Sequence, residues 1–286
     1  MTDPATGSLR VPGATLHYEV RGRGPLLLLI PGGAGGAASF DGVADDLAAE
    51  YTVATYDPRG MSRSPLDDPE AEQHVAEHAD DAYRLLELLS PDEPARVFGA
   101  SSGAITALHL LTAHPHRVAR VVAHEPPTVE VLPDAAAQRA LLARVQETLR
   151  TEGLMPAMAI LAAGLQKDGD PAEQKAELEL PPQAAARAER TMANLPYFVG
   201  RIVPRFMAHV PDLARLRMLS DRLVLACGHD SRGELPHRTA ARLAERLGTD
   251  LLHFPGGHTG LTTHPAEFGA LLRKALEPSG PSAQLP

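Results

Sequence analysis

The chain has 286 residues, of which 44% are hydrophobic and 22% are charged, so it carries enough apolar material for a sizeable core. We expect one large globular domain with room for an insertion. Lys and Arg number 27 and Asp and Glu number 36, which gives a net charge of −9 at pH 7. Because that sign is wrong for neutralising phosphates, we expect neither nucleic acid nor an anionic membrane surface as a partner.

Cysteine content and the N-terminal segment bear on the location of the protein. Cys227 is the single cysteine, so an internal disulfide is excluded and a Cys-based metal site is not expected. It lies in an apolar run, where a thiol acts as a small buried hydrophobe. The segment MTDPATGSLR has no apolar stretch typical of a signal peptide, and no segment approaches the roughly 18 apolar residues of a membrane helix. We expect a cytoplasmic protein and leave open whether it forms a homodimer.

Short apolar runs alternate with longer helical patterns, which predicts an α/β fold built on a mostly parallel sheet of about eight strands. The first two runs flank the turn pair Pro12-Gly13 and predict an antiparallel hairpin. The predicted strands are residues 9–11, 15–20, 26–30, 52–56, 96–99, 118–123, 223–227 and 251–254. The predicted helices are residues 40–49, 71–89, 104–113, 236–247 and 265–276.

The alternation fails over residues 126–217, where helix-like spacing continues without a convincing strand pattern. Prolines divide this segment into short pieces, because proline ends a helix or begins the next one. We interpret residues 126–217 as a helical insertion into a core formed by residues 1–125 and 218–277. The tail, residues 278–286, is rich in Pro and Ser and is predicted to be disordered.

The segment Gly99-Ala100-Ser101-Ser102-Gly103 stands between a predicted strand and a predicted helix. This is G-x-S-x-G in the strand–turn–helix context of a nucleophile elbow. The turn strains the serine backbone and brings neighbouring backbone close, which requires small residues at Gly99 and Gly103. It exposes the Ser101 hydroxyl and leaves the Ser102 amide at a helix N-terminus, where it can stabilise an oxyanion. The motif predicts Ser101 as a nucleophile.

With this elbow, the chain outside residues 126–217 resembles the α/β-hydrolase fold superfamily. Pro31-Gly32-Gly33 stands where the superfamily usually has His-Gly-x after its third strand. The resemblance implies that the Gly33 amide is the second oxyanion donor. Proline in place of histidine departs from the family pattern but retains that amide.

A further segment carries the same resemblance. Residues 57–64, DPRGMSRS, resemble the family's D-x-R-G-x-G-x-S loop, with Ser62 in place of the second glycine. We assign this loop a structural role. The resemblance implies an α/β-hydrolase fold, a sheet flanked by helices, in which residues 126–217 form a helical lid.

A serine hydroxyl needs a base within hydrogen-bond reach to take its proton. The chain has 13 histidines, and the order serine, acid, histidine of this fold requires one just after the last strand. His258 fits, because its Gly-rich loop lies between the last predicted strand and the final predicted helix. His253 lies inside the strand and His264 starts the helix, so we expect packing or surface roles for both.

The sequence favours Asp230 as the acid of the triad, because the segment GHDS at residues 228–231 follows a predicted strand. Its carboxylate would orient the imidazole and stabilise the imidazolium. Glu125 is the alternative, since some members of the superfamily place the acid after the sixth strand, where HEPP lies. Glu125 could equally bind substrate or cap the insertion.

Residues 33–38 also match G-x-G-x-x-[GA] after a strand, with Asp57 about 20 residues on, as in a dinucleotide fingerprint. A short-chain dehydrogenase would need Tyr-x-x-x-Lys, but no lysine stands four residues after a tyrosine. The scarcity of lysine excludes a Walker A loop, and no HExxH or CxxC spacing exists for a metal. We therefore expect no cofactor and no metal, and interpret the glycines as an oxyanion loop.

Serine at the elbow argues against dehalogenase and epoxide-hydrolase chemistry, which use a carboxylate nucleophile in this superfamily. The motifs predict a serine hydrolase that cleaves a small or medium carboxylic ester or lactone through an acyl-enzyme. The predicted site comprises the triad Ser101, Asp230 and His258 and the oxyanion donors Gly33 and Ser102. Alternatives left open are a proline-type peptidase or amidase, a cofactor-free perhydrolase, and a receptor-like member with slow turnover.

Within the insertion, residues 191–207 are dense in apolar side chains although only 4% of the chain is aromatic. Such residues can line a pocket for a small ligand or pack the insertion onto the sheet. The set comprises Met192, Leu195, Tyr197, Phe198, Ile202, Val203, Phe206 and Met207.

Overall fold

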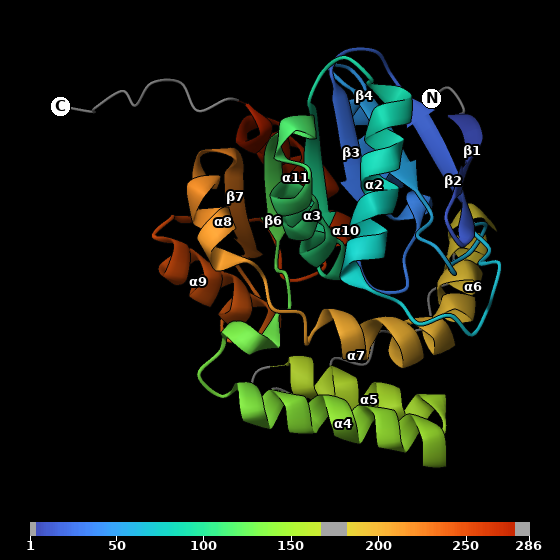
Figure 1. Cartoon of the computed structure of the whole chain (residues 1–286), viewed down its shortest axis with the longest axis vertical. Helices are drawn as coiled ribbons and strands as arrows, with labels where there is room; N and C mark the ends of the chain where they lie inside the picture. The colour runs from blue at the N-terminus through green and yellow to red at the C-terminus, as the bar shows by residue number, and fades with distance from the viewer. Residues whose placement is uncertain (1–3, 167–181, 278–286) are drawn as a thin grey trace.

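The computed structural model describes residues 4–166 and 182–277 of the chain. Within these residues, eight strands form one sheet in the order β1-β2-β4-β3-β5-β6-β7-β8 (Figure 1). The pairs β1–β2 and β2–β4 are antiparallel and the remaining pairs are parallel, so the predicted mostly parallel sheet is confirmed. The strands are β1 (Ala5–Val11), β2 (Ala14–Arg21), β3 (Leu26–Ile30), β4 (Thr52–Tyr56), β5 (Ala95–Ala100), β6 (Val118–His124), β7 (Leu223–Gly228) and β8 (Leu251–Phe254).

The predicted hairpin opens the sheet. Val11 pairs with Ala14 across the Pro12-Gly13 turn, and Gly13 has a φ of 77°, which glycine adopts without steric cost. The first strand begins at Ala5 and not at residue 9, because its pairing with β2 continues to Ala5, opposite Val20. β2 is longer than predicted by Ala14, which pairs with Val11, and by Arg21, which pairs with Val53 of β4.

Helices cover both faces of the sheet (Figure 1). All five residues of β3 are buried. Leu28 and Ile30 pack in the cluster that includes α2, α3 and α9, whereas Leu27 and Leu29 pack in the cluster that includes α1 and α11. The continuous apolar run therefore belongs to a strand buried on both faces, as predicted. The flanking helices are α1 (Asp41–Leu47), α2 (Val75–Leu89), α3 (Ser102–Ala113), α9 (Leu235–Leu247), α10 (Gly260–Thr263) and α11 (Pro265–Leu276).

Helix α2 begins later than the residue 71 predicted from periodicity. The His74 amide donates to the Glu77 side chain at 3.2 Å, which forms part of a capping box with His74 as N-cap. A capping box satisfies amides that have no partner within the helix and so sets its first residue.

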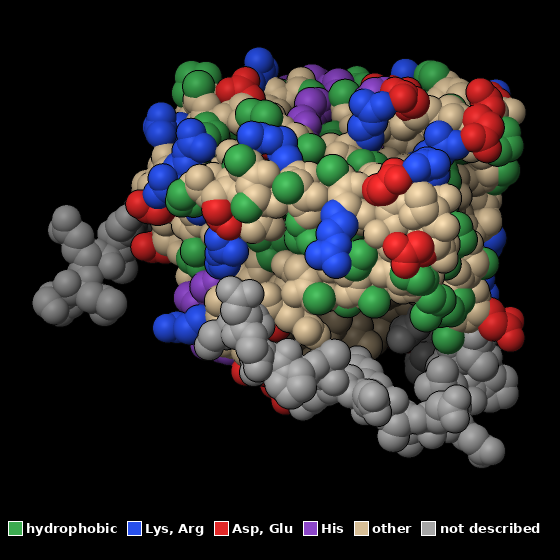
Figure 2. Space-filling model, turned by 90° about the horizontal axis from the view of Figure 1, so that it is seen from below, with side chains coloured by type: hydrophobic (Ala, Val, Ile, Leu, Met, Phe, Trp, Pro, Cys, Tyr) green, Lys and Arg blue, Asp and Glu red, His purple; other side chains and the backbone are tan. Residues whose placement is uncertain are grey.

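Between β6 and β7, the described residues form helices and no strand, as predicted for this part of the chain. These elements are η3 (Val129–Val131), α4 (Ala135–Thr151), α5 (Leu154–Leu165), α6 (Pro182–Tyr197), η4 (Phe198–Ile202), α7 (Val203–Phe206), α8 (Leu213–Met218) and η5 (Ser220–Arg222). In Figure 1, α4 and α5 lie side by side beneath the sheet and α7 lies between them and the sheet. Figure 2 views the molecule from below and shows acidic, basic and hydrophobic side chains intermixed over this face.

Prolines in this segment act partly as predicted. Pro156 and Pro204 lie in the first turns of α5 and α7, where a missing amide costs little. Pro196 lies inside the last turn of α6. It does not stop the helical path, which widens into the π-helical turn η4 directly afterwards, because proline removes one backbone hydrogen bond from the regular ladder.

Two further expectations concern the C-terminal tail and a membrane-spanning helix. The tail at residues 278–286, predicted to be disordered, lies outside the described residues. Over residues 4–166 and 182–277, no helix combines the length and apolar character that crossing a membrane requires.

The loop after β4 is tied to α2 by a buried ion pair. Arg59 donates from Nε and Nη2 to the two carboxylate oxygens of Asp81 at 2.7 and 2.5 Å. The two side chains are 6% and 1% exposed. Such a bidentate pair fixes the loop geometrically, and each charge depends on the other for compensation.

Removing the Asp81 carboxylate should therefore be costly. Asp81→Ala leaves the buried Arg59 guanidinium with only the more distant carboxylate of Glu77, at 3.8 Å, as a counter-charge, and should lower the free energy of unfolding by about 3–5 kcal/mol. Asp80→Ala on the same helix removes an exposed pair with Arg84 and should cost less than about 1 kcal/mol. Urea unfolding measures both, and equal losses would contradict a special role for the buried pair.

Candidate active site

Ser101 lies at the sharp turn between β5 and α3, in the predicted elbow. Its φ and ψ are 53° and −120°, a region that a non-glycine residue rarely occupies. A Cβ on Gly99 would lie 2.4 Å from the Gly103 carbonyl oxygen, and one on Gly103 would lie 2.4 Å from the Ile30 carbonyl oxygen. Close packing of β3, β5 and α3 therefore requires both glycines, as the motif indicated.

His258 connects Ser101 to a carboxylate. The Ser101 hydroxyl lies 3.2 Å from His258 Nε2, and His258 Nδ1 lies 2.5 Å from Glu125 Oε2. Since an ionised carboxylate accepts hydrogen bonds, Nδ1 carries the proton and Nε2 faces the serine as an acceptor. The structure thus brings together two residues predicted for the site, Ser101 and His258, and adds Glu125.

Glu125 follows β6 and is completely buried. Besides His258, its carboxylate accepts the amide of Gly228 at 2.9 Å and a short hydrogen bond from the Ser231 hydroxyl. Burial alone would raise the pKa of Glu125, but hydrogen bonds from His258 and Ser231 and the charges of His258 and His124 outweigh it and lower the pKa to about 2. The carboxylate is therefore ionised near neutral pH.

Asp230, the acid favoured by sequence, does not occupy this position. Its side chain is exposed, and its amide donates to the Gly256 carbonyl at 3.0 Å. The last residue of β7, Gly228, and Ser231 in the loop after it contribute hydrogen-bond donors rather than the carboxylate. We therefore correct the contact with His258 from Asp230 to Glu125, the alternative considered from sequence.

The two predicted oxyanion donors lie next to each other. Gly33 has a φ of 60°, and its amide donates to the Ser102 hydroxyl at 3.1 Å. Ser102 is the first residue of α3, where first-turn amides have no acceptor within the helix. The Gly33 amide therefore lies at the N-terminus of α3, the positive end of the helix dipole.

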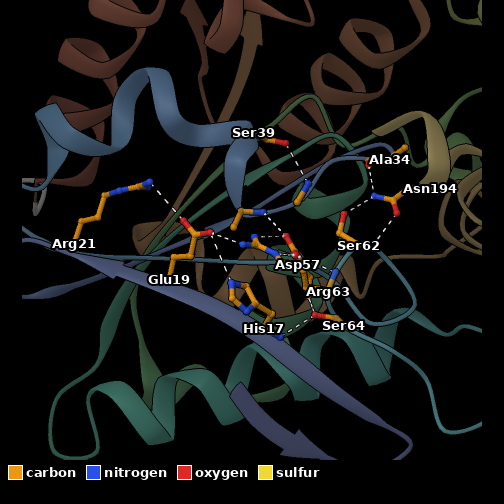
Figure 3. Close-up of polar contacts among 12 residues, drawn as sticks. His17, Glu19, Arg21, Ala34, Ser39, Asp57, Ser62, Arg63, Ser64 and Asn194 are labelled. Atoms are coloured by element: carbon orange, nitrogen blue, oxygen red, sulfur yellow. Dashed lines mark hydrogen bonds and ion pairs between the residues drawn. The ribbon is translucent and has the colours of Figure 1, made fainter. Parts of the chain in front are cut away.

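Asn194 of α6 joins the glycine loop to the loop after β4, which no sequence pattern indicated. Its side-chain amide donates to the Ala34 carbonyl and the Ser62 hydroxyl, each at 2.9 Å. Its carbonyl oxygen accepts the Ser62 amide at 2.8 Å (Figure 3). Ser62 has a φ of 49°. The described part of α6 therefore fixes the backbone next to Gly33.

Asp57 anchors the same region from β4. Its carboxylate accepts the amide of Ala37 at 2.9 Å and Nε of Arg63 at 2.7 Å (Figure 3). Arg63 also pairs with Glu19 on β2 at 2.9 Å. Asp57 therefore caps the turn after the glycine loop, in keeping with the structural role predicted for residues 57–64.

A pocket lies beside Ser101 and His258. Its lining is mainly apolar and comes largely from α5, η4 and α7. These lining residues are Leu161, Leu165, Phe198, Ile202, Val203, Phe206 and Met207. Most of them belong to the apolar set noted at residues 191–207. Met192, from the same set, is 56% exposed, so its side chain does not pack in the core.

Histidines set aside from sequence lie outside this hydrogen-bond chain. His264 is the N-cap of α11, as predicted. His253 lies in β8 and its ring stacks on that of His229, with centroids 5.4 Å apart. His258 is thus the histidine that meets Ser101.

Comparison with known sequences places this geometry in a family. Residues 25–190 match a family model described as alpha/beta hydrolase fold. YraK of Bacillus subtilis (strain 168), an uncharacterised hydrolase, is 36% identical over 276 residues, which cover 95% of this chain and 96% of the relative.

Solved structures share the fold. A thermophilic esterase from Thermogutta terrifontis matches with a TM-score of 0.71 at 20% identity, over 96% of this chain and all (100%) of the esterase. The enol-lactonase from Burkholderia xenovorans LB400 matches with a TM-score of 0.66 at 19% identity, over 94% of this chain and 99% of the lactonase. With the family match and the nearly full-length Bacillus relative, the resemblance seen in the motifs is confirmed. The chain is a hydrolase that belongs to the α/β-hydrolase fold family.

Proposed function

We propose that this hydrolase cleaves carboxylic esters or lactones of small or medium size through an acyl-enzyme. The observation that carries the proposal is the hydrogen-bond chain from Glu125 through His258 to Ser101. A serine hydroxyl becomes a nucleophile when a base within hydrogen-bond reach takes its proton, and a third group holds that base in position.

The proposed reaction has two halves. Ser101 Oγ attacks the substrate carbonyl carbon while its proton passes to His258 Nε2, and Glu125 stabilises the resulting imidazolium. When the ester C–O bond breaks, His258 returns the proton to the leaving alcohol, which stays tethered to the acyl group if the substrate is a lactone. Water activated by His258 then hydrolyses the acyl-enzyme and restores Ser101.

The oxyanion formed in each half would lie between the amides of Gly33 and Ser102. Amides already aimed at this position need little reorganisation as negative charge develops. The Ser102 hydroxyl, which accepts the Gly33 amide at 3.1 Å, would turn aside when the oxyanion binds. Asn194 and Asp57 hold the backbone that follows Gly33, at Ala34 and Ala37, and so keep the Gly33 amide directed.

The helical segment at residues 126–217 would serve as a lid that encloses the acyl or alcohol group. Its α5, η4 and α7 supply most of the apolar pocket wall next to Ser101. Apolar walls favour hydrocarbon groups and exclude water from the reacting carbonyl. The structural neighbours include an esterase and an enol-lactonase, which supports ester and lactone substrates.

Replacing Ser101 tests the reaction class. Ser101→Ala should reduce kcat on chromogenic esters and on a lactone panel by about 10⁴-fold or more, with an unchanged melting temperature. A fluorophosphonate probe should label the wild-type chain at Ser101, as mapped by mass spectrometry, and should not label the variant. Labelling at Ser102, or full activity of Ser101→Ala, would refute the proposal.

Two carboxylate variants test the acid. Glu125→Gln keeps acceptor capacity for Gly228 and Ser231 but cannot hold the imidazolium, and should lower kcat by roughly 10⁴-fold. Asp230→Asn, at an exposed side chain in the neighbouring loop, is the matched control and should stay close to wild type. The melting temperature of each variant should be measured to check that both variants fold. A larger loss in Asp230→Asn would return the role to Asp230.

Two phenylalanines separate pocket lining from packing. Phe198 is half-buried beside the pocket, so Phe198→Ala should shift preference between short and long acyl esters with little change in melting temperature. Phe206 is 2% exposed and packs edge-on against His78 at 4.8 Å. Phe206→Ala should therefore cost about 3–5 kcal/mol of stability. If Phe198→Ala instead loses activity equally on esters of all acyl lengths, in parallel with a fall in its melting temperature, Phe198 has a packing role.

A further inference from the structure

Away from Ser101, one cysteine and two histidines from three elements converge where β7 and β8 end. Cys227 on β7 pairs in register with His253 on β8, so their side chains project from the same face of the sheet. His237 of α9 lies over this face, and the ligand atoms of all three residues lie within 4.8 Å of one another. Cys227 is buried, whereas both imidazoles are half-buried and accessible to an ion from solvent.

We propose that Cys227, His237 and His253 form a binding site for a borderline-soft divalent cation, of which Zn²⁺ and Co²⁺ are examples. One thiolate and two imidazoles suit such ions, which take tetrahedral S and N ligands in proteins. In a tetrahedral site with bonds of about 2.0–2.3 Å, ligand atoms lie about 3.3–3.8 Å apart. The ligand atoms, which lie within 4.8 Å of one another, would close in by at most about 1.5 Å, through rotation of the half-buried imidazoles.

His229 is placed to supply a fourth ligand. The His229 ring stacks on His253 with centroids 5.4 Å apart and planes 29° apart. His229 stands two residues after Cys227, so it continues the same face of the chain, and it is exposed. Either His229 or a water molecule would complete the coordination.

Metal binding would convert the Cys227 thiol into the thiolate, which is the form that binds metal ions. Burial, followed by the negative charge of Glu125, raises the pKa of Cys227 to about 12. Without a metal the sulfur therefore keeps its proton and is a poor nucleophile. When the metal–sulfur bond forms, that proton leaves to solvent, as in other thiolate metal sites.

An ion here would link two strands whose following loops build the Ser101 site. Cys227 is adjacent to Gly228, which donates to Glu125. The His229 amide donates to the Phe254 carbonyl, directly after His253, at 2.9 Å. Because the ion would bind the folded chain and not the unfolded one, it should raise the melting temperature. It would touch no reacting atom, so the site does not depend on the proposed ester chemistry.

Cobalt titration of the untagged full chain, freed of metal by a chelator, tests the site directly. We expect one equivalent of Co²⁺ to produce a thiolate-to-cobalt charge-transfer band in the near ultraviolet, together with the visible bands of tetrahedral cobalt. Zn²⁺ should displace Co²⁺, so that the charge-transfer band and the visible bands disappear, and should raise the melting temperature of the protein. Absence of the charge-transfer band in the wild-type chain would overturn the proposal.

Variants identify the ligands. Cys227→Ser should abolish the charge-transfer band, and His237→Gln should weaken Co²⁺ binding by at least about 10-fold. His116→Ala, at an exposed histidine of η2 (Pro115–Arg117), is the control and should bind as wild type does. If Cys227→Ser fails to fold, His253→Gln takes its place and should weaken Co²⁺ binding as much as His237→Gln does. Binding that survives in His237→Gln and His253→Gln alike would refute this ligand set.

Discussion

An ionised carboxylate with no access to solvent is the constraint on which the carboxyl edge of this sheet depends. Glu125 is completely buried, and a buried charge is unfavourable unless hydrogen bonds and an opposite charge compensate it. Compensation comes from Gly228 at the end of β7, from Ser231 in the loop after β7 and from His258 in the loop after β8. These loops must close around Glu125 for the charge to be tolerated, so satisfying the carboxylate and assembling the site are one folding event.

The order of strands makes this closure geometrically simple. β5, β6, β7 and β8 are consecutive neighbours and parallel, so their carboxyl ends meet at one edge of the sheet. Ser101 follows β5, Glu125 follows β6, and His258 follows β8. The same arrangement brings Cys227 of β7 beside His253 of β8, on the face covered by α9. Neighbouring strand ends therefore support both the proposed hydrolase site and the proposed metal site.

The opposite side of the proposed oxyanion position is held by a different set of contacts. Asn194 of α6 binds both Ala34 and Ser62, and Asp57 caps the turn at Ala37. Movement of α6 would disturb hydrogen bonds to the backbone that directs the Gly33 amide. The helical segment is in this way coupled to the loops of the proposed site through polar contacts and not only through the apolar pocket wall.

Local sequence patterns determined much of this architecture. The elbow at Ser101, the glycine loop, the buried strands and the late His258 each depend on residues close together in the chain, where periodicity and turn chemistry act directly. Long-range choices needed the tertiary structure. Asp230 and Glu125 both follow a strand whose end lies near His258, and nothing local distinguishes them; burial and hydrogen-bond donors on other strands decide for Glu125. The contacts of Asn194 and the convergence of Cys227 with His237 and His253 likewise join segments that carry no shared motif. A sequence pattern records the demands of its own segment, whereas the compensation of a buried charge, or the meeting of three ligands, is set by which elements pack together in space.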